Sequence, residues 1–335
     1  MLRLFRPLDI CAVGAGTRDV FVTSTHFERE PDAKAPDGFD ACFPMGAKIP
    51  LDEVIFETGG GATNAAVTFR RFGLKTACIC AVGDDPNGQD VVDALKQENI
   101  DTRGVQMMSG KKTSYSVILL AGTGQRSILV YRGAANTLDM SGHAWSKLAC
   151  RWYYLTSLGG DLAKNKALFR RAKAAQSSLA WNPGNGELAL GLKTLRPLLE
   201  QTDILIMNRE EAAVLAHCQP KDLDRIIKTL GPIPQTALVV TDGGHGAYVL
   251  DRQIGELLYS LALPGRRINT TGAGDAFGSA FVAAYIKSGD CRTGLRAGLL
   301  NSLGVITHMG AKTGILDKFP GIKKLSRIRV QVLNV

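Results

Sequence analysis

The chain has 335 residues, enough to bury a large core and to form one large α/β domain with a smaller appendage, or two ordinary domains. Hydrophobic residues make up 45% and charged residues 21%, and no apolar run reaches membrane-spanning length, so we expect a soluble protein without a membrane partner. The net charge of +9 comes without a long run of Lys and Arg interleaved with aromatic residues, which argues against nucleic acid as a partner.

Seven cysteines are scattered along the chain with no Cys-x-x-Cys pair. An odd number without regular spacing predicts reduced, mostly buried thiols, and neither a disulfide framework nor a zinc site. Residues 1–8 are too short and too charged for the apolar segment of a signal peptide. We therefore expect a cytoplasmic protein.

The first part of the chain contains strands without helices between them. A strand is predicted over 10–13 and ends in glycines, and short apolar runs follow at 20–22 and 54–56. The stretch between these two runs is polar and contains prolines. Short strands of this kind predict a small sheet that projects from the main body.

From residue 59 onward, segments with strand and helix spacing alternate. In chain order, the predicted elements are helix 63–72, strand 77–82, helix 88–98, a hairpin of 113–120 and 127–132 joined by 121–125, strand 152–155, helix 164–177, strand 179–181, helix 192–200, strand 204–207, helix 209–216, strands 237–240 and 246–250, and helices 273–287 and 293–308. Repeated βα units of this length predict a mostly parallel sheet covered by helices on both faces.

The most informative motif is the stretch 268–277, Ile-Asn-Thr-Thr-Gly-Ala-Gly-Asp-Ala-Phe. Small residues stand where a loop becomes an apolar helix, and glycines there let the backbone approach a ligand closely. The unpaired amides of a first helical turn, together with the helix dipole, form an anion site. Two roles suit Asp275 in that turn: it takes a proton from a hydroxyl that attacks a bound phosphate, or it caps the helix.

A second glycine motif occupies 59–64, Gly-Gly-Gly-Ala-Thr-Asn, directly before an Ala-rich helix. One interpretation is close backbone approach to a polar ligand, with the Asn64 amide bound to a hydroxyl, and the other is a flexible hinge. Neither motif is a Walker A loop, because no Gly-Lys-Ser/Thr follows. Gly14 and Gly16 do not form a dinucleotide fingerprint, because the third glycine and the helix are missing.

Together the two motifs resemble the paired signatures of the ribokinase-like (phosphofructokinase-B type) carbohydrate kinases. In that family Gly-Gly-x-x-x-Asn precedes an Ala-rich helix, a strand and Gly-Asp-Asp-x-x-Gly, which here correspond to 59–64 and 83–88. The second signature, Thr-x-Gly-Ala-Gly-Asp, corresponds to 270–275. The resemblance covers residues 8–318 and implies a three-layer α/β/α fold with a mostly parallel central sheet and a small β-sheet lid.

On this basis we expect residues 1–19, 59–112 and 133–335 to form the nucleotide- and substrate-binding core. Residues 20–58 and 113–132 would form the lid. Lids in similar proteins often pair two subunits, and the exposed edge of a small sheet is a physical reason to expect the same. We therefore expect a homodimer formed through the lid.

The resemblance also implies roles for individual residues. Asp275 would be the catalytic base, and the backbone of Gly272, Ala273 and Gly274 would form the anion hole for the migrating phosphoryl group. The residues expected to bind the acceptor are Asp19, Gly60, Gly61 and Asn64. The residues expected to bind the nucleotide are Asn208, Glu211, Thr241, Gly243, Gly246 and Asn301, of which Asn301 would lie near the adenine. Glu211 would also organise Mg²⁺ through water.

Some of these assignments have simpler alternatives. Asp19 is otherwise a carboxylate of a surface loop. Asn208 and Glu211 have the spacing of a helix capping box, and both of their roles can hold at once. Asn269 stands where the family usually has an Asp that helps to hold a monovalent cation, so dependence on K⁺ is left open.

The implied activity is ATP-dependent, Mg²⁺-requiring phosphorylation of a primary hydroxyl on a sugar, with Asp275 as the base of an in-line transfer. Two alternatives stay open. The first is a nucleoside kinase (adenosine or inosine type) on the same fold, and the second is a non-catalytic regulator that binds a sugar or a nucleotide. The presence of the base, both glycine motifs and Glu211 argues against the regulator, because a binding protein needs no base.

Overall fold

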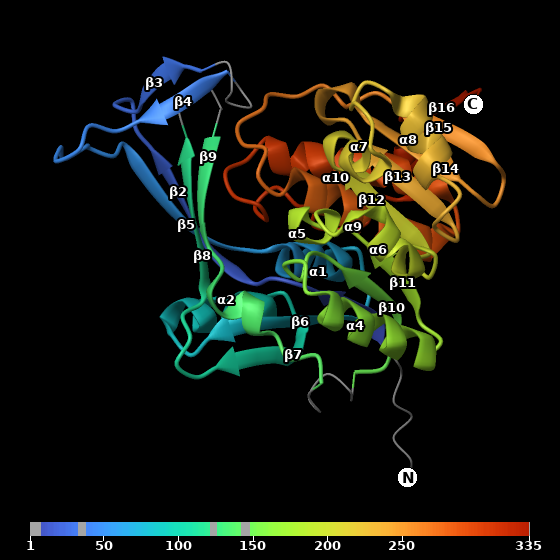
Figure 1. Cartoon of the computed structure of the whole chain (residues 1–335), viewed down its shortest axis with the longest axis horizontal. Helices are drawn as coiled ribbons and strands as arrows, with labels where there is room; N and C mark the ends of the chain where they lie inside the picture. Colours follow the sequence, from blue (N-terminus) through green and yellow to red (C-terminus); the bar gives the residue numbers. More distant parts are fainter. Residues whose placement is uncertain (1–7, 33–37, 121–125, 142–147, 335) are drawn as a thin grey trace, which may run out of the picture.

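The computed structural model describes residues 8–32, 38–120, 126–141 and 148–334 (Figure 1). Its main feature is a sheet of ten strands. In spatial order these are β16 (Gln331–Leu333), β15 (Glu256–Ser260), β14 (Ala247–Asp251), β13 (Ala237–Thr241), β12 (Ile204–Asn208), β11 (Ser178–Trp181), β10 (Cys150–Leu155), β1 (Leu8–Val13), β6 (Thr76–Gly83) and β7 (Asp101–Met108). All pairings from β13 to β7 are parallel, and those from β13 to β16 are antiparallel. The sheet is therefore mostly parallel, as predicted.

Helices cover both faces of this sheet. One face carries α1 (Gly61–Arg71), α2 (Pro86–Gln97), α9 (Ala273–Ser288), α10 (Cys291–Ile306) and α11 (Ile322–Leu325). The other face carries α4 (Leu162–Ala174), α5 (Asn185–Leu188), α6 (Gly191–Leu199), α7 (Arg209–Ala216) and α8 (Leu223–Leu230). Short 3-10 turns lie at η1 (Gly133–Thr137) and η2 (Gly243–His245).

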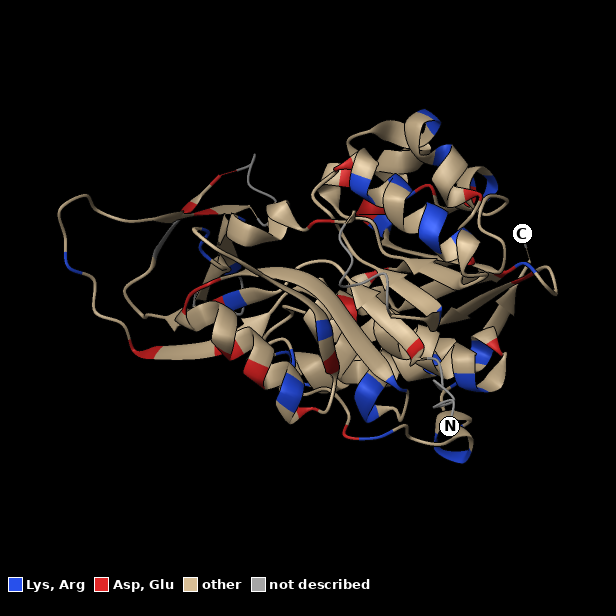
Figure 2. Cartoon of the chain, turned by 90° about the horizontal axis from the view of Figure 1, so that it is seen from below, with Lys and Arg blue, Asp and Glu red and all other residues tan. Residues whose placement is uncertain are grey.

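Two apolar cores lie between these layers. Successive residues of β6 alternate between them, with Cys78 and Cys80 in one core and Ala77 and Ile79 in the other. A strand buried on both faces needs a continuous apolar run, which explains the sequence of β6. Figure 2 shows that charged residues lie mainly on the helices and loops around the sheet. The predicted three-layer α/β/α fold is confirmed.

A separate four-stranded sheet, called here the small sheet, projects from the body (Figure 1). Its strands in order are β5 (Glu53–Gly59), β2 (Thr17–Thr23), β8 (Ser114–Leu120) and β9 (Arg126–Tyr131). A further pair, β3 (Glu28–Pro31) and β4 (Phe39–Cys42), lies at its far end. The predicted pairing of the last two strands is confirmed, while their joining loop, 121–125, lies outside the described residues.

Several elements were not predicted, and they are short or polar. They are β3, β4, β7, β15, β16, α5, α8, α11 and the turns η1 and η2. The helix predicted over 164–177 ends at Ala174, because Gln176 adopts a left-handed conformation with φ of 51°. All seven cysteines are free thiols, and five of them are buried, as predicted. Among the described residues, no helix combines the length and the apolar character that crossing a bilayer requires.

Candidate active site

The Gly-Ala-Gly-Asp motif forms the start of α9. Gly272 is the N-cap residue, with a left-handed φ of 80°, and a Cβ at this position would lie 2.6 Å from the Cβ of buried Ala311. Only glycine fits both constraints. A Cβ at Gly274, in contrast, would meet no atom within 4 Å, so the space beside it is open. The first-turn amides, which have no acceptor within the helix, therefore lie beside an open space that suits an anion.

Asp275 does not cap this helix. No side chain bonds to the backbone at its N-cap, and the Asp275 carboxylate instead accepts a hydrogen bond from Asn64 Nδ2, at 2.9 Å. Asn64 lies on α1, 211 residues away in sequence. This contact joins the two glycine motifs, as their assignment to one site requires.

Burial raises the pKa of the Asp275 carboxyl, and the hydrogen bond from Asn64 acts in the opposite direction. The nearby charge of Asp19 raises this pKa further, while that of Lys312 lowers it. A carboxylate with a raised pKa is a stronger base than one in water. The environment of Asp275 is therefore suited to accepting a proton.

Asp19 lies within β2 and is only 5% exposed, so the surface-loop alternative is wrong. Its Oδ1 accepts a hydrogen bond from Thr17 Oγ1 at 2.8 Å. A Cβ at Gly59 would lie 1.7 Å from Asp19 Oδ2, so the absence of a side chain there makes room for the carboxylate. Burial raises the pKa of Asp19 as well.

The second glycine motif is closely packed and is not a hinge. Gly60 is the N-cap of α1 with φ of 95°, and a Cβ on it would lie 2.4 Å from the carbonyl oxygen of Ala15. A Cβ on Gly61 would lie 3.0 Å from the side chain of Thr156, the residue that follows β10. Within the described residues, the buried Asn64 Oδ1 has no hydrogen-bond partner. An unpaired buried acceptor is expensive, and it suits a ligand hydroxyl at this position.

With the exception of Asn301, the residues expected to bind the nucleotide lie at or just beyond the ends of β12 and β13. Asn208 and Thr241 are direct neighbours in the two paired strands. A tight turn follows, in which the N–H of Asp242 donates to the carbonyl of Gly246 at 2.8 Å. Gly243 and Gly246 both have positive φ, and a Cβ on Gly246 would lie 2.0 Å from the carbonyl oxygen of Ser260. The turn thus depends on glycine.

Asn208 and Glu211 form the predicted capping box of α7. Asn208 Oδ1 accepts from the Glu211 N–H at 2.8 Å, and Glu211 Oε2 accepts from the Asn208 N–H at 2.9 Å. Burial raises the pKa of Glu211, and the charge of Asp275 adds to this effect. Glu211 therefore lies within electrostatic reach of Asp275.

The donor set of the site suits one kind of metal. Among the described residues, no group of three or more His, Cys, Asp or Glu side chains could hold a metal ion. Mg²⁺ keeps several of its waters and binds through one or two carboxylates together with substrate phosphates. A single carboxylate such as Glu211 fits this mode of binding.

Asn301 lies away from these residues. Its side chain is fully buried, with Nδ2 donating to the carbonyl of Ala276 at 2.9 Å and Oδ1 accepting from the Leu316 N–H at 3.0 Å. The amide also contacts Thr68 Oγ1 at 3.3 Å. Asn301 thus links α10 to α9 and α1, and the structure does not bring its side chain to the other nucleotide residues.

Two cationic residues at the site were not predicted. Lys312 Nζ donates to Thr58 Oγ1 at 2.9 Å, and Arg126 Nη1 of β9 donates to Thr270 Oγ1 in the loop before α9. Burial lowers the pKa of Lys312 to about 8. No sequence signal marks these two residues, because single cations in loops or at strand ends resemble the other Lys and Arg residues of the chain.

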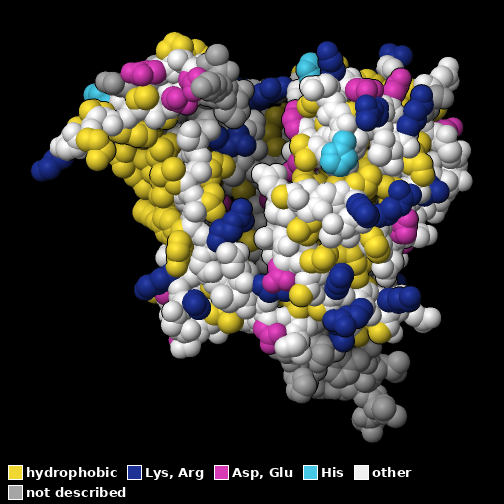
Figure 3. Space-filling view, in the orientation of Figure 1, with side chains coloured by type: hydrophobic (Ala, Val, Ile, Leu, Met, Phe, Trp, Pro, Cys, Tyr) yellow, Lys and Arg dark blue, Asp and Glu magenta, His cyan; other side chains and the backbone are white. Residues whose placement is uncertain are grey.

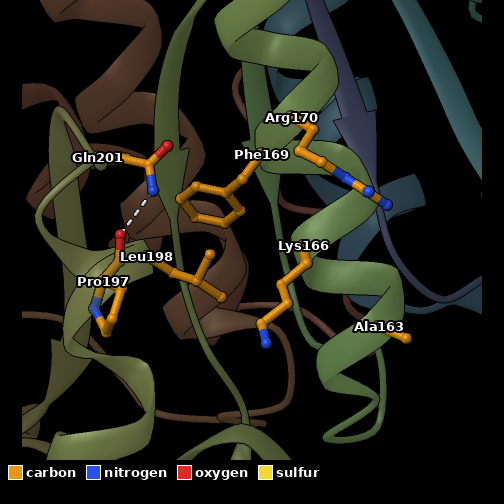
Figure 4. A pocket seen from close by; sticks show the side chains of 7 residues that line it. All are labelled: Ala163, Lys166, Phe169, Arg170, Pro197, Leu198 and Gln201. Carbon is orange, nitrogen blue, oxygen red and sulfur yellow. Dashed lines mark hydrogen bonds between the residues drawn. The ribbon is translucent and has the colours of Figure 1, made fainter.

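A shallow cavity of about 420 Å³ lies elsewhere, between α4 and α6 (Figure 4). Its lining residues are Ala163, Lys166, Phe169, Arg170, Pro197, Leu198 and Gln201. None of the predicted site residues contributes to it. Figure 3 shows a different hollow, which lies between the small sheet and the core.

Comparison with known proteins identifies a family that matches this chain. The family model "pfkB family carbohydrate kinase" matches residues 42–318. The chain is 25% identical over 262 residues to the ribokinase of Haemophilus influenzae, an alignment that covers 77% of this chain and 83% of that protein. It is 23% identical to the nucleoside kinase of Methanothermobacter thermautotrophicus, over 80% of this chain and 84% of that protein.

Among solved structures, the fold is similar to that of Arabidopsis thaliana ribokinase complexed with ribose and ATP. The TM-score is 0.77 at 19% sequence identity, and the superposition covers 96% of this chain and 98% of that one. At this level of sequence identity, the similarity shows a shared fold alone.

Proposed function

This chain belongs to the pfkB family of carbohydrate kinases and is a phosphotransferase, and from that premise we propose that it transfers the γ-phosphoryl group of ATP to a primary hydroxyl of a sugar. The observation that carries the proposal is the hydrogen bond between Asn64 and Asp275. It brings the half-buried Asp275 carboxylate to the side chain of Asn64, so that the acceptor motif meets the first turn of α9.

The proposed mechanism assigns one task to each group. Asp19 and Asn64 orient the acceptor, and Asp275 takes the proton from the hydroxyl as its oxygen attacks the γ-phosphorus. A new P–O bond forms, the bond to the ADP oxygen breaks in line with it, and ADP leaves. The amides of residues 272–274 stabilise the charge on the transferred group.

We assign Glu211 as the residue that holds Mg²⁺, through water. When bound, Mg²⁺ supplies positive charge that offsets the charge of the phosphates. Asn269 is a poor ligand for a monovalent cation, because its Oδ1 already accepts from the Thr271 N–H at 3.0 Å and its Nδ2 is a donor. We therefore propose that residue 269 supplies no anionic ligand for K⁺. Seven free thiols suit a reducing compartment, and we propose a cytoplasmic location.

A nucleoside kinase is the second candidate, since a relative of that name aligns with 80% of this chain. The test is a coupled ADP-release assay with ATP and Mg²⁺ over a panel of pentoses, hexoses, sugar phosphates and nucleosides. We expect one free sugar to raise ADP release well above the others. Turnover of a nucleoside alone would select the second candidate. ATP binding without turnover of any acceptor would contradict both and favour a regulator.

We also propose that the small sheet acts as a lid and pairs two copies of the chain. Its outer face carries the exposed residues Phe56 and Leu129, which flank Val20 and Val117 in one row across the four strands. Figure 3 shows this apolar area on the small sheet. A contiguous apolar face on a projecting sheet is typical of an interaction surface.

This proposal predicts the effect of placing a charged side chain in the apolar row of the small sheet. Leu129→Lys should convert a dimer into a monomer, because burying an unpaired ammonium at the interface is unfavourable. Sedimentation equilibrium gives the mass of each variant. Met45→Lys is the matched control, since Met45 is equally apolar and 98% exposed but lies outside this row. A monomeric wild-type chain, or dissociation by both variants alike, would argue against pairing through the lid.

A further inference from the structure

Lys312, in the loop between α10 and α11, brings an ammonium to the acceptor side of the site. Its Nζ bonds to Oγ1 of Thr58, a residue near the end of β5 that is only 8% exposed. The next residue is Gly59, which makes room for the Asp19 carboxylate. Lys312 and Asp19 therefore lie beside neighbouring residues, Thr58 and Gly59, at the same end of this strand.

The loop that carries Lys312 is fixed on both sides. Thr313 Oγ1 donates to Glu57 Oε1 at 3.3 Å, which ties the loop to β5. On the other side, Ala311 packs against Gly272 at the start of α9. The position of Lys312 between the acceptor residues and the anion site is thus set by its neighbours in sequence.

The titratable groups around Lys312 come from two sheets. Asp19 and Glu57 belong to the small sheet, and the buried thiols of Cys78 and Cys80 belong to β6 of the central sheet. Among the described residues, no carboxylate oxygen forms an ion pair with Lys312 within 4.0 Å. An ammonium has three donors, and Thr58 uses one of them.

The groups that face Asp275 come from four other elements. They are Asn64 on α1, Asp19 on β2, Tyr154 on β10 and Glu211 on α7. Among them Asp19 and Glu211 are acidic, and their negative charges favour a protonated Asp275. Among the described residues, Lys312 is the cation whose charge lowers the pKa of both Asp275 and Asp19.

We propose that Lys312 is a positioning residue that keeps the Asp19 and Asp275 carboxylates ionised together, so that Asp275 can accept a proton at neutral pH. The inference rests on the proposed function, since it concerns the base of that reaction. Two carboxylates that influence one another in a poorly hydrated site cannot both ionise easily, and a cation that lowers the pKa of both makes their joint ionisation easier. The loop that carries this cation is also fixed by Thr313 and Ala311, so its position does not depend on the hydrogen bond to Thr58 alone.

A purely structural role would make Lys312 a tether between the loop and β5. Two variants separate this role from the electrostatic one. Thr58→Val removes the hydrogen bond and keeps the charge, while Lys312→Met removes both. Lys312→Arg keeps the positive charge but changes the size and shape of the side chain.

The first measurement is the pH profile of kcat/KM from pH 5 to 9 for these three variants and the wild type. In Lys312→Met the acid limb should move to higher pH, with about tenfold lower kcat/KM at the acid end and less than about threefold change on the plateau. Lys312→Arg should restore the limb, and Thr58→Val should leave it unmoved. A uniform loss at every pH in Lys312→Met, or an equal shift in Thr58→Val, would overturn the proposal.

A second measurement does not depend on turnover. The ¹³C signal of the Asp275 carboxyl, assigned by its loss in Asp275→Asn, should titrate at higher pH in Lys312→Met than in the wild type. An unchanged midpoint would contradict the inference even in an active enzyme. If no acceptor is phosphorylated, the proposed function fails, and this midpoint still decides the role of Lys312.

Discussion

Asp275→Asn should lower kcat by about a hundred- to ten-thousandfold, the usual contribution of a general base, while the affinity for ATP stays close to that of the wild type. Asn has almost the same shape and still bonds to Asn64, so the change removes the ability to take a proton and little else. Turnover by the coupled assay and ATP affinity by calorimetry are the two readouts. Near-normal turnover would refute the role of Asp275 as base.

The same variant carries its own control for folding. Burial raises the pKa of Asp275 in the folded chain above its unfolded value, so the group destabilises the fold once the pH rises through the folded pKa. A neutral Asn removes this charge. At neutral pH we therefore expect Asp275→Asn to melt at the same temperature as the wild type or a higher one, and a lower Tm would mean that inactivity reflects damage to the fold.

Gly272→Ala should destabilise the chain by about 2–4 kcal/mol and abolish phosphoryl transfer. The estimate combines a left-handed φ for a residue with a Cβ and a clash in a packed region. The clash is with Ala311, which is 1% exposed and would be met through its backbone as well as its Cβ. The midpoint of urea unfolding measures the loss of stability, and the coupled assay measures the activity.

Gly274→Ala is the matched control, because it adds the same methyl group two residues away. No atom lies within 4 Å of that position, so the midpoint of unfolding should stay within about 0.5 kcal/mol of the wild type. Its methyl group would instead enter the open space assigned to the phosphoryl group and raise KM for ATP. Equal destabilisation by both substitutions would show that the start of α9 is not shaped as described.

Much of the fold follows from local patterns. The apolar runs of β1, β6 and β12 are each buried on both faces of the central sheet, and this is the pattern that a parallel sheet requires. In contrast, β7 contains Asp101, Arg103 and Gln106 and lies at the edge of the sheet, where burial on both faces is not needed. Propensity alone could not separate that strand from a polar connection.

The candidate site likewise has residues that the sequence reveals and residues that only the structure reveals. The glycine motifs could be found because backbone geometry dictates their residue types, and the role expected for Asp275 followed from the family resemblance that these motifs carry. The contact between Asn64 and Asp275 required the structure, because α1 and α9 are far apart in sequence. Lys312 was missed since one lysine in a loop carries no pattern. Asn301 satisfies a structural need of α10 that its position in the sequence does not reveal.

The order of the strands has a consequence for synthesis on the ribosome. β1 lies between β6 and β10, so the first strand lacks one neighbour until Cys150–Leu155 has been made. Until then this edge of β1 stays unpaired and the face opposite α1 and α2 stays uncovered, so shortened chains that end before this point should aggregate. The residues at 270–275 emerge much later than the glycine motif at 59–64. Under the proposed mechanism, a nascent chain therefore contains its acceptor-binding residues before the residues proposed to bind the phosphoryl group.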